Sequence, residues 1–279
     1  MQIGLATLLC SSVHTAPDRD LVHCLPLMKQ AGVDAIEYND QSLPRYWIDP
    51  LDQCLAVAEA ARRCDVDLLS AHNPCADYFP TAPDEPTRRK AIDAHKYMIE
   101  VLGRLGVKYF VFHHVGGPAD QDPHILEFGH AALEELLPVA RRHRVVLLIE
   151  NFYNFPVERL LPTIERFGDE WLGICVDVGH AHHSHYPVTP AGEIRAAAPY
   201  LRSLHIHDNH GHEAGDEHLP PGWGTIDWPS VVTALRDVNY QGPFMMEVMR
   251  NDKRLAAHSP EDAIAVVADA ARAVLAQQT

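Results

Sequence analysis

Four acidic or imidazole side chains stand where the strands of a parallel sheet are expected to end. They are Glu150, Asp177, His205 and Glu247. Each ends or closely follows a short apolar run of the kind that forms a buried strand. An isolated carboxylate is costly to bury, so Glu150 and Glu247 require a cation there. Three carboxylates and one imidazole form a mostly hard ligand set that suits Mn²⁺, Mg²⁺, Co²⁺ or Zn²⁺. The alternative for each residue taken alone is a buried side chain satisfied by the backbone or by an arginine.

Two further histidines are expected beside this set. His180 lies three residues after Asp177 and is predicted to bind a second ion or a substrate oxygen. A solvated loop histidine is the alternative. His207 has the same strand parity as His205, so both side chains should point to one face of the sheet. Only one of the pair needs to bind metal, and His207 is a candidate for substrate binding.

Histidines also end two earlier strands. His72 and His114 are candidates for substrate binding, or for binding an additional metal ion. A core histidine capped by a backbone carbonyl is an equal alternative for each. His113 has the opposite parity to His114 and is predicted to be structural.

The segment 209–228, NHGHEAGDEHLPPGWGTIDW, is rich in His, Asp and Gly. Loops longer than about 12 residues in a compact domain usually carry function. Asp216 and His218 have the spacing of a second metal-binding pair within it. We therefore expect this loop to contribute to the site.

The elements that position these side chains alternate regularly along the chain. Short apolar runs rich in β-branched or aromatic residues alternate with longer segments of helical period, which is typical of βαβ units. Eight such pairs predict an α/β fold, a single (β/α)₈ TIM barrel in which residues 1–279 form one domain. Catalytic groups of such barrels lie at the C-terminal ends of the strands. The predicted strands are Ile3–Leu8, Asp34–Tyr38, Val66–Ala71, Val107–His113, Val145–Glu150, Leu172–Val178, Leu201–His207 and Phe244–Met249.

The composition of the chain limits the classes of partner that the protein can bind. The 279 residues include 23 Lys or Arg and 38 Asp or Glu, a net charge of −15 that argues against a nucleic-acid partner. No apolar run approaches the roughly 20 residues of a membrane helix, and the start MQIGLATLLC has no basic leader, so we expect a cytoplasmic protein without a membrane partner. The six cysteines form no C-x-x-C pair, which indicates reduced thiols. No organic cofactor is expected. The sequence is compatible with a homo-oligomer and does not fix the oligomeric state.

The order of the motifs resembles the xylose isomerase-like TIM barrels, specifically the sugar phosphate isomerase/epimerase superfamily. These motifs are I-E-N at 149–151, D-V-G-H at 177–180, H-I-H-D-N at 205–209, D-E-H-L-P-P-G-W-G-T-I-D-W at 216–228 and M-M-E at 245–247. The resemblance covers essentially the whole chain. Its motifs are specific for the superfamily but do not identify the substrate. It implies that the metal ligands are Glu150, Asp177, His205 and Glu247 and that His180 contacts substrate. His205 is preferred to His207 because the family's H-x-x-D-N pattern places the ligand there.

The pattern is also similar to that of endonuclease IV, a multi-zinc DNA-repair relative on the same barrel. Its phosphate-contacting residues are replaced, since Glu217 stands inside the D-E-H segment and no lysine follows Asp208-Asn209. Cys75 and Ala76 follow Pro74 where residues that probe DNA are expected. A DNA substrate is therefore disfavoured, although the ligands could persist. That resemblance implies metal ligands at His72, His114, Glu150, Asp177, His180, His205, Asp216, His218 and Glu247.

The leading expectation is a divalent-metal-dependent isomerase or epimerase of a small polyhydroxylated aldehyde or ketone. The ion would chelate the carbonyl and the adjacent hydroxyl and stabilise an enediolate, while Glu150 and Glu247 take and return a proton from opposite sides. The first alternative is a multi-metal phosphoesterase that uses the additional ligands. A metal- or sugar-binding module without activity is the weaker alternative, because two opposed carboxylates exceed what binding requires.

Overall fold

The computed structural model describes residues 1–10, 21–39, 51–73, 79–82, 84–115 and 124–277. Eight parallel strands form one sheet in the order β7-β6-β5-β4-β3-β2-β1-β8. A parallel bridge between Ile206 and Met246 joins the two ends of this order, so the sheet is a nearly closed barrel. The predicted (β/α)₈ TIM barrel is confirmed. The strands are β1 (Ile3–Ala6), β2 (Ala35–Tyr38), β3 (Asp67–His72), β4 (Tyr109–Phe112), β5 (Val146–Glu150), β6 (Leu172–Asp177), β7 (Leu201–His205) and β8 (Phe244–Met246).

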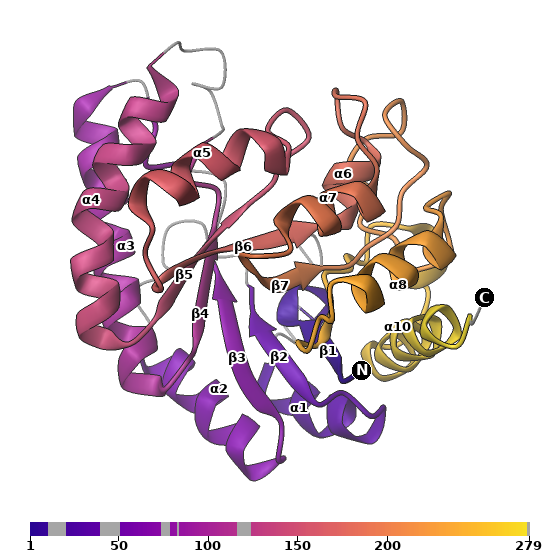
Figure 1. Ribbon diagram of the computed structural model, residues 1–279. Coiled ribbons are helices and arrows are strands. Elements are labelled where there is room, and N and C mark those ends of the chain that lie inside the picture. The colour runs from indigo at the N-terminus through magenta and orange to yellow at the C-terminus, as the bar shows by residue number, and fades with distance from the viewer. Residues whose placement is uncertain (11–20, 40–50, 74–78, 83, 116–123, 278–279) are drawn as a thin grey trace.

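Helices cover the outside of the barrel (Figure 1). Helix ends have the capping residues expected from the sequence. The Ser259 side chain accepts a hydrogen bond from the Asp262 N–H at the start of α10. Gly106 ends α3 in the left-handed conformation, with φ 78°. The helices are α1 (Leu21–Gln30), α2 (Leu51–Arg63), α3 (Glu85–Leu105), α4 (Ile125–His143), α5 (Val157–Phe167), α6 (Val178–His182), α7 (Pro190–Ala197), α8 (Trp228–Asp237), α9 (Lys253–Ala256) and α10 (Pro260–Leu275), with a 3₁₀ turn at Thr7–Leu9.

The strands are buried on both faces, and each face belongs to a separate apolar layer. The large layer joins the outer faces of the strands to the helices and includes Phe110 and Phe112 of β4. A small layer made by alternate residues of β4, β5 and β6 fills the inside of the barrel, and its buried members are Tyr109, Val111, Leu148 and Cys175. Alternation along a strand therefore places residue 150 of β5 and residue 177 of β6 on the inner face, above this layer.

Five strands end earlier than predicted. Strand β6 stops at Asp177, where α6 begins, and strands β1, β4, β7 and β8 stop at Ala6, Phe112, His205 and Met246. The residues that follow them belong to the loops of the C-terminal rim, where a TIM barrel carries its site. No helix in the described parts of the chain is both long and apolar enough to cross a membrane.

Candidate active site

The four residues expected to bind metal come together on the inner face of the barrel. One ligand atom from each of Glu150, Asp177, His205 and Glu247 lies within 4.8 Å of the others, and all four side chains are buried. Nδ1 of His205 is 2.7 Å from Oε1 of Glu150 and 3.4 Å from Oε2 of Glu247. We call this group site A. Its three carboxylates and one imidazole are suited to a divalent cation.

Imidazole groups compensate the buried carboxylates of site A. Burial alone would raise the pKa of Glu150, but His205, His113 and His72 hold it well below its ordinary value. Burial would lower the pKa of His205, yet the nearby thiol of Cys175 and carboxylates raise it well above the usual range. Each group is thus held in its charged form by its neighbours, as expected where opposite charges lie close together in a buried site.

One oxygen of site A supports the fit of a cation. Oδ1 of Asp177 accepts a hydrogen bond from the His180 N–H at 2.7 Å and caps α6. Oδ2 is buried and accepts none from the described residues, its nearest imidazoles being Nδ1 of His180 and of His205 at 3.8 Å. A buried, unpaired carboxylate oxygen is costly unless an ion coordinates it. The donor set and this oxygen both fit a divalent ion.

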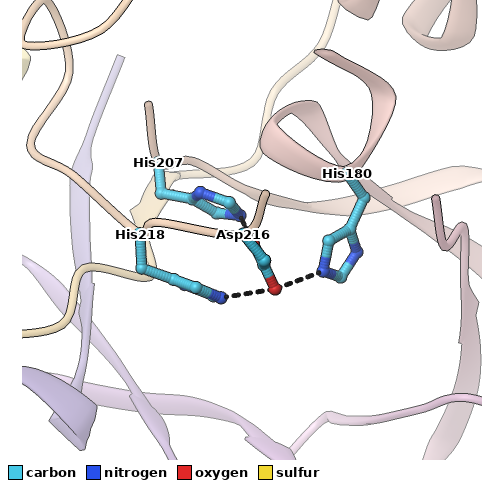
Figure 2. Close-up of side chains that lie close together, drawn as sticks. All are labelled: His180, His207, Asp216 and His218. Atoms are coloured by element: carbon cyan, nitrogen blue, oxygen red, sulfur yellow. Dashed lines mark hydrogen bonds and ion pairs between the residues drawn. The ribbon is translucent and has the colours of Figure 1, made fainter. Parts of the chain in front are cut away.

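A second cluster lies beside the first. Figure 2 shows the carboxylate of Asp216 between the rings of His180 and His218, with His207 behind it. Oδ2 of Asp216 is 3.1 Å from Nε2 of His218 and 3.4 Å from Nε2 of His180. The ring of His207 stacks on that of His218 with centroids 3.9 Å apart. One ligand atom from each of the four lies within 4.8 Å of the others. We call this group site B.

Backbone carbonyls orient two imidazoles of site B. Nδ1 of His218 is 2.7 Å from the carbonyl oxygen of Glu247, and Nδ1 of His180 is 3.0 Å from that of Asn151. Each Nδ1–H can donate to its carbonyl, which leaves Nε2 facing Asp216. Metal-binding histidines are oriented in this way. Burial would lower the pKa of His218, but Asp216 raises it to about 9.

The long loop between β7 and α8 delivers Asp216 and His218, as the sequence predicts. Asp208 organises it: its carboxylate accepts hydrogen bonds from the backbone N–H groups of Gly222 and Ile226 and from Nε1 of Trp228, at 2.8, 3.2 and 2.8 Å. An antiparallel bridge pairs Asp208 with Leu219. These bonds fold the loop back over the rim, where His218 reaches site B.

The structure corrects the prediction for the histidines after β4. His113, predicted to be structural, lies on the inner face with Nε2 3.5 Å from Oε2 of Glu150. His114, predicted to bind substrate or metal, faces outward and packs against Gly129 of α4. Tyr109 and Val111 are the inward residues of β4, and continued alternation carries 113 inward. His72 is on the inner face as expected, with Nε2 2.9 Å from Oε2 of Glu150.

Two residues of β2 and its following loop escaped the sequence prediction. Glu37 is fully buried, with Oε1 2.9 Å from Nε2 of His205. Asn39 is also fully buried and donates a hydrogen bond from Nδ2 to Oε1 of Glu247 at 2.7 Å. The signal was present, because Glu37 is a carboxylate inside a short apolar strand.

Comparison with known proteins agrees with this architecture. Residues 25–273 match the profile of the family described as xylose isomerase-like TIM barrel. A D-psicose 3-epimerase of Enterocloster bolteae is 25% identical over 233 residues, 77% of this chain and 72% of that protein.

Solved structures share the fold at lower identity. The crystal structure of D-psicose 3-epimerase with D-tagatose from Clostridium cellulolyticum H10 has a TM-score of 0.79 at 19% identity, covering 99% of each chain. That of the IolI protein with a bound zinc atom has a TM-score of 0.78 at 20% identity, covering 100% of this chain and 99% of the other. With its nearly closed barrel of eight parallel strands and the profile match over most of its length, the chain belongs to the xylose isomerase-like TIM barrel family.

Proposed function

We propose that the protein is a divalent-metal-dependent epimerase or isomerase of a small sugar or related hydroxy-ketone, acting at site A. The observation that carries the proposal is the pair Glu150 and Glu247, whose ligand oxygens lie within 4.8 Å of each other and of His205. Relatives named as D-psicose 3-epimerases support the substrate class. Residues of site A would hold the ion.

The chain's own residues supply the proton transfer. Glu150 and Glu247 come from β5 and from the loop after β8, so they approach a substrate from different sides of the barrel. One carboxylate takes the proton from the carbon next to the carbonyl, and the other returns a proton to the opposite face. His72, His180 and His207 hold the substrate oxygens. His113 has the substrate-binding role that the sequence had suggested for His114. A bound divalent ion would polarise the carbonyl and stabilise the negative charge of the enediolate.

Solvent-proton exchange tests the roles of the two carboxylates. Protein loaded with Mn²⁺, Co²⁺, Mg²⁺ or Zn²⁺ is incubated in deuterated water with a panel of ketoses that includes D-psicose and D-tagatose, and deuterium in recovered sugar is measured by NMR. The wild type should incorporate deuterium and interconvert two epimers. Glu150→Gln and Glu247→Gln should each abolish incorporation. Glu193→Gln, which changes a buried glutamate of α7, is the matched control and should retain it.

Two outcomes contradict the proposal in different ways. Retained exchange in both carboxylate variants would refute their role in proton transfer. Failure of the fully loaded wild type to convert any sugar or hydroxy-ketone, phosphorylated or free, would refute the epimerase function itself.

The second candidate function is a multi-metal phosphoesterase related to endonuclease IV. Site B favours it, because three imidazoles and a carboxylate converge beside site A and could hold an additional ion. His72 and His113 contact Glu150 and offer further ligands. A metal-activated water would attack the phosphorus of a phosphate ester.

Metal stoichiometry separates the two candidates. Purified protein is analysed for metal content per chain, together with Asp216→Ala and His218→Ala. One ion that survives both substitutions favours the epimerase. Two or three tightly held ions, with at least one lost in each variant and phosphatase activity in the wild type, would favour the phosphoesterase.

A further inference from the structure

We propose that Glu37 of strand β2 and Asn39, which follows the strand, position two ligands of site A. Glu37 acts on His205, and Asn39 acts on Glu247. This role goes beyond the metal ligands and proton-transfer groups, and it rests on the proposed metal centre at site A. Glu37 and Asn39 have the same parity, so both project to the inner face of the barrel. Neither contacts solvent.

Glu37 fixes which nitrogen of His205 faces the carboxylates. Its Oε1 is 2.9 Å from Nε2 of His205, whereas Nδ1 of the same ring is 2.7 Å from Oε1 of Glu150. The partner of one imidazole nitrogen decides the orientation of the ring and the role of the other. With Nε2 in contact with Glu37, Nδ1 is the nitrogen that faces the carboxylates of site A.

Glu37 is itself held in place. Ser70 of β3 donates its hydroxyl to Oε2 of Glu37 at 2.8 Å. The two oxygens of Glu37 are therefore divided between a neighbouring strand and the ligand His205. Rotation of the carboxylate would break the bond to Ser70 in addition to the contact with His205.

Asn39 performs the corresponding task for Glu247. Its Nδ2 donates to Oε1 of Glu247 at 2.7 Å, which leaves Oε2 facing Nδ1 of His205 at 3.4 Å. The backbone N–H of Asn39 donates to the hydroxyl of Thr7, and that hydroxyl donates to the carbonyl oxygen of Asn39, each at 2.9 Å. The backbone N–H of Glu247 donates to the carbonyl oxygen of Ile206 at 3.0 Å, and the Asn39 amide anchors the Glu247 side chain.

A purely structural role would not require a carboxylate at position 37. Burying a charge inside a barrel costs several kcal/mol unless a partner compensates it, and an apolar side chain would fill the same volume. Among the described residues, the Glu37 carboxylate contacts Ser70 and the ligand His205. The choice of residue is explained by the orientation of His205.

Metal affinity of substituted proteins tests the proposal. Chelator-treated protein is titrated with Mn²⁺ and with Zn²⁺ by calorimetry. Glu37→Met and Asn39→Leu preserve side-chain volume and remove the contacts, and each should weaken binding by about 10- to 100-fold, the usual effect of removing a group that orients a metal ligand. Glu37→Gln keeps an oxygen beside Nε2 of His205 and the acceptor for Ser70, so it should remain within about fivefold of the wild type and is the conservative rescue.

A matched control separates positioning from loss of stability. Glu193→Met removes another buried glutamate, one that accepts the N–H of Val157 and lies outside site A. It should leave metal affinity unchanged whatever it does to the melting temperature. Wild-type affinity in both Glu37→Met and Asn39→Leu would overturn the proposal. If Glu37→Met does not fold, Ser70→Ala must weaken binding severalfold, and wild-type affinity there would overturn the role of Glu37.

Crystal structures of the metal-free variants distinguish this proposal from the proposed function. If the wild type binds no divalent ion, the metal-dependent function fails, but the positioning claim is still tested by side-chain conformation. In Glu37→Met the His205 ring should leave its 2.7 Å contact with Glu150, and in Asn39→Leu the Glu247 carboxylate should rotate. Unchanged side chains in both variants would refute positioning by β2.

Discussion

Nε2 of His207 lies 3.1 Å from Oδ1 of Asp177, and this contact joins site A to site B. Asp177 belongs to site A, while His207 belongs to site B. Both side chains are completely buried. Displacement of the His207 ring should therefore disturb the geometry of both sites. Gly179, which lies next to this ring, allows that to be tested.

Gly179 leaves the space that the His207 imidazole occupies. A methyl group on Gly179 would overlap that ring, so Gly179→Ala must displace His207 or distort α6. We expect Gly179→Ala to lose any ion at site B and its kcat/KM to fall at least tenfold. A displacement of about 1 Å in an active site can lower the rate about 100-fold. Metal content and kcat/KM check this. Gly192→Ala, where among the described residues the methyl meets only the Thr189 hydroxyl, should retain both. Full metal content and activity in Gly179→Ala would contradict the expectation.

Asp208 should be essential for the loop that carries Asp216 and His218. Asp208→Ala leaves the indole N–H of Trp228 and the backbone N–H of Ile226 without their acceptor. Unsatisfied buried donors cost about 1–3 kcal/mol each, so we expect the free energy of unfolding to fall by about 3 kcal/mol. Urea denaturation followed by tryptophan fluorescence measures it. Asp227→Ala, which removes the N-cap of α8 in the same segment, should cost only about 1 kcal/mol. Equal losses in the two variants would contradict the role of Asp208.

The barrel and site A could be predicted because both follow from local patterns. Apolar runs separated by helical segments define the strands, and parallel strands bring residues at their C-terminal ends to one rim. Glu150 and Asp177 therefore required no tertiary information. The same geometry predicted that His205 and His207 share a face, and both contact Asp177.

Other contacts depend on information that a single strand does not carry. The run Tyr109-Phe110-Val111-Phe112 is apolar on both faces, so nothing in it distinguishes inside from outside. For that reason the sequence prediction placed His113 and His114 on the wrong faces of the barrel wall. Asn39 meets Glu247 across 208 residues of sequence, and only closure of the barrel brings them together.

Glu193 should make stability depend on pH. Burial raises the pKa of this carboxyl from its ordinary 4.5 to about 7. Between these values the folded protein binds a proton that the unfolded chain does not, so stability falls as pH rises from 4.5 through 7. The difference amounts to about 3 kcal/mol above pH 7, from roughly 1.4 kcal/mol per pKa unit.

Glu193→Gln should remove this dependence. Its amide oxygen can still accept the N–H of Val157, but it carries no charge to bury. We expect the variant to match the wild type near pH 4.5 and to exceed its stability at pH 8. Chemical denaturation at both pH values measures the two free energies. A variant less stable than the wild type at pH 8 would contradict the raised pKa.

Substitution of the two adjacent histidines after β4 should give opposite results. Both nitrogens of His114 are buried without a hydrogen-bond partner among the described residues, and burial lowers its pKa to about 3. An apolar group of similar size removes these unsatisfied atoms, so His114→Leu should keep activity and be neutral or stabilising. Burial also lowers the pKa of His113 to about 3, but its Nε2 faces Glu150. His113→Leu should therefore lower kcat/KM by at least tenfold, because a neutral imidazole beside Glu150 is lost from the site. Activity assays and thermal melts of both variants decide this, and a loss of activity in His114→Leu greater than that in His113→Leu would restore the original assignment from the sequence.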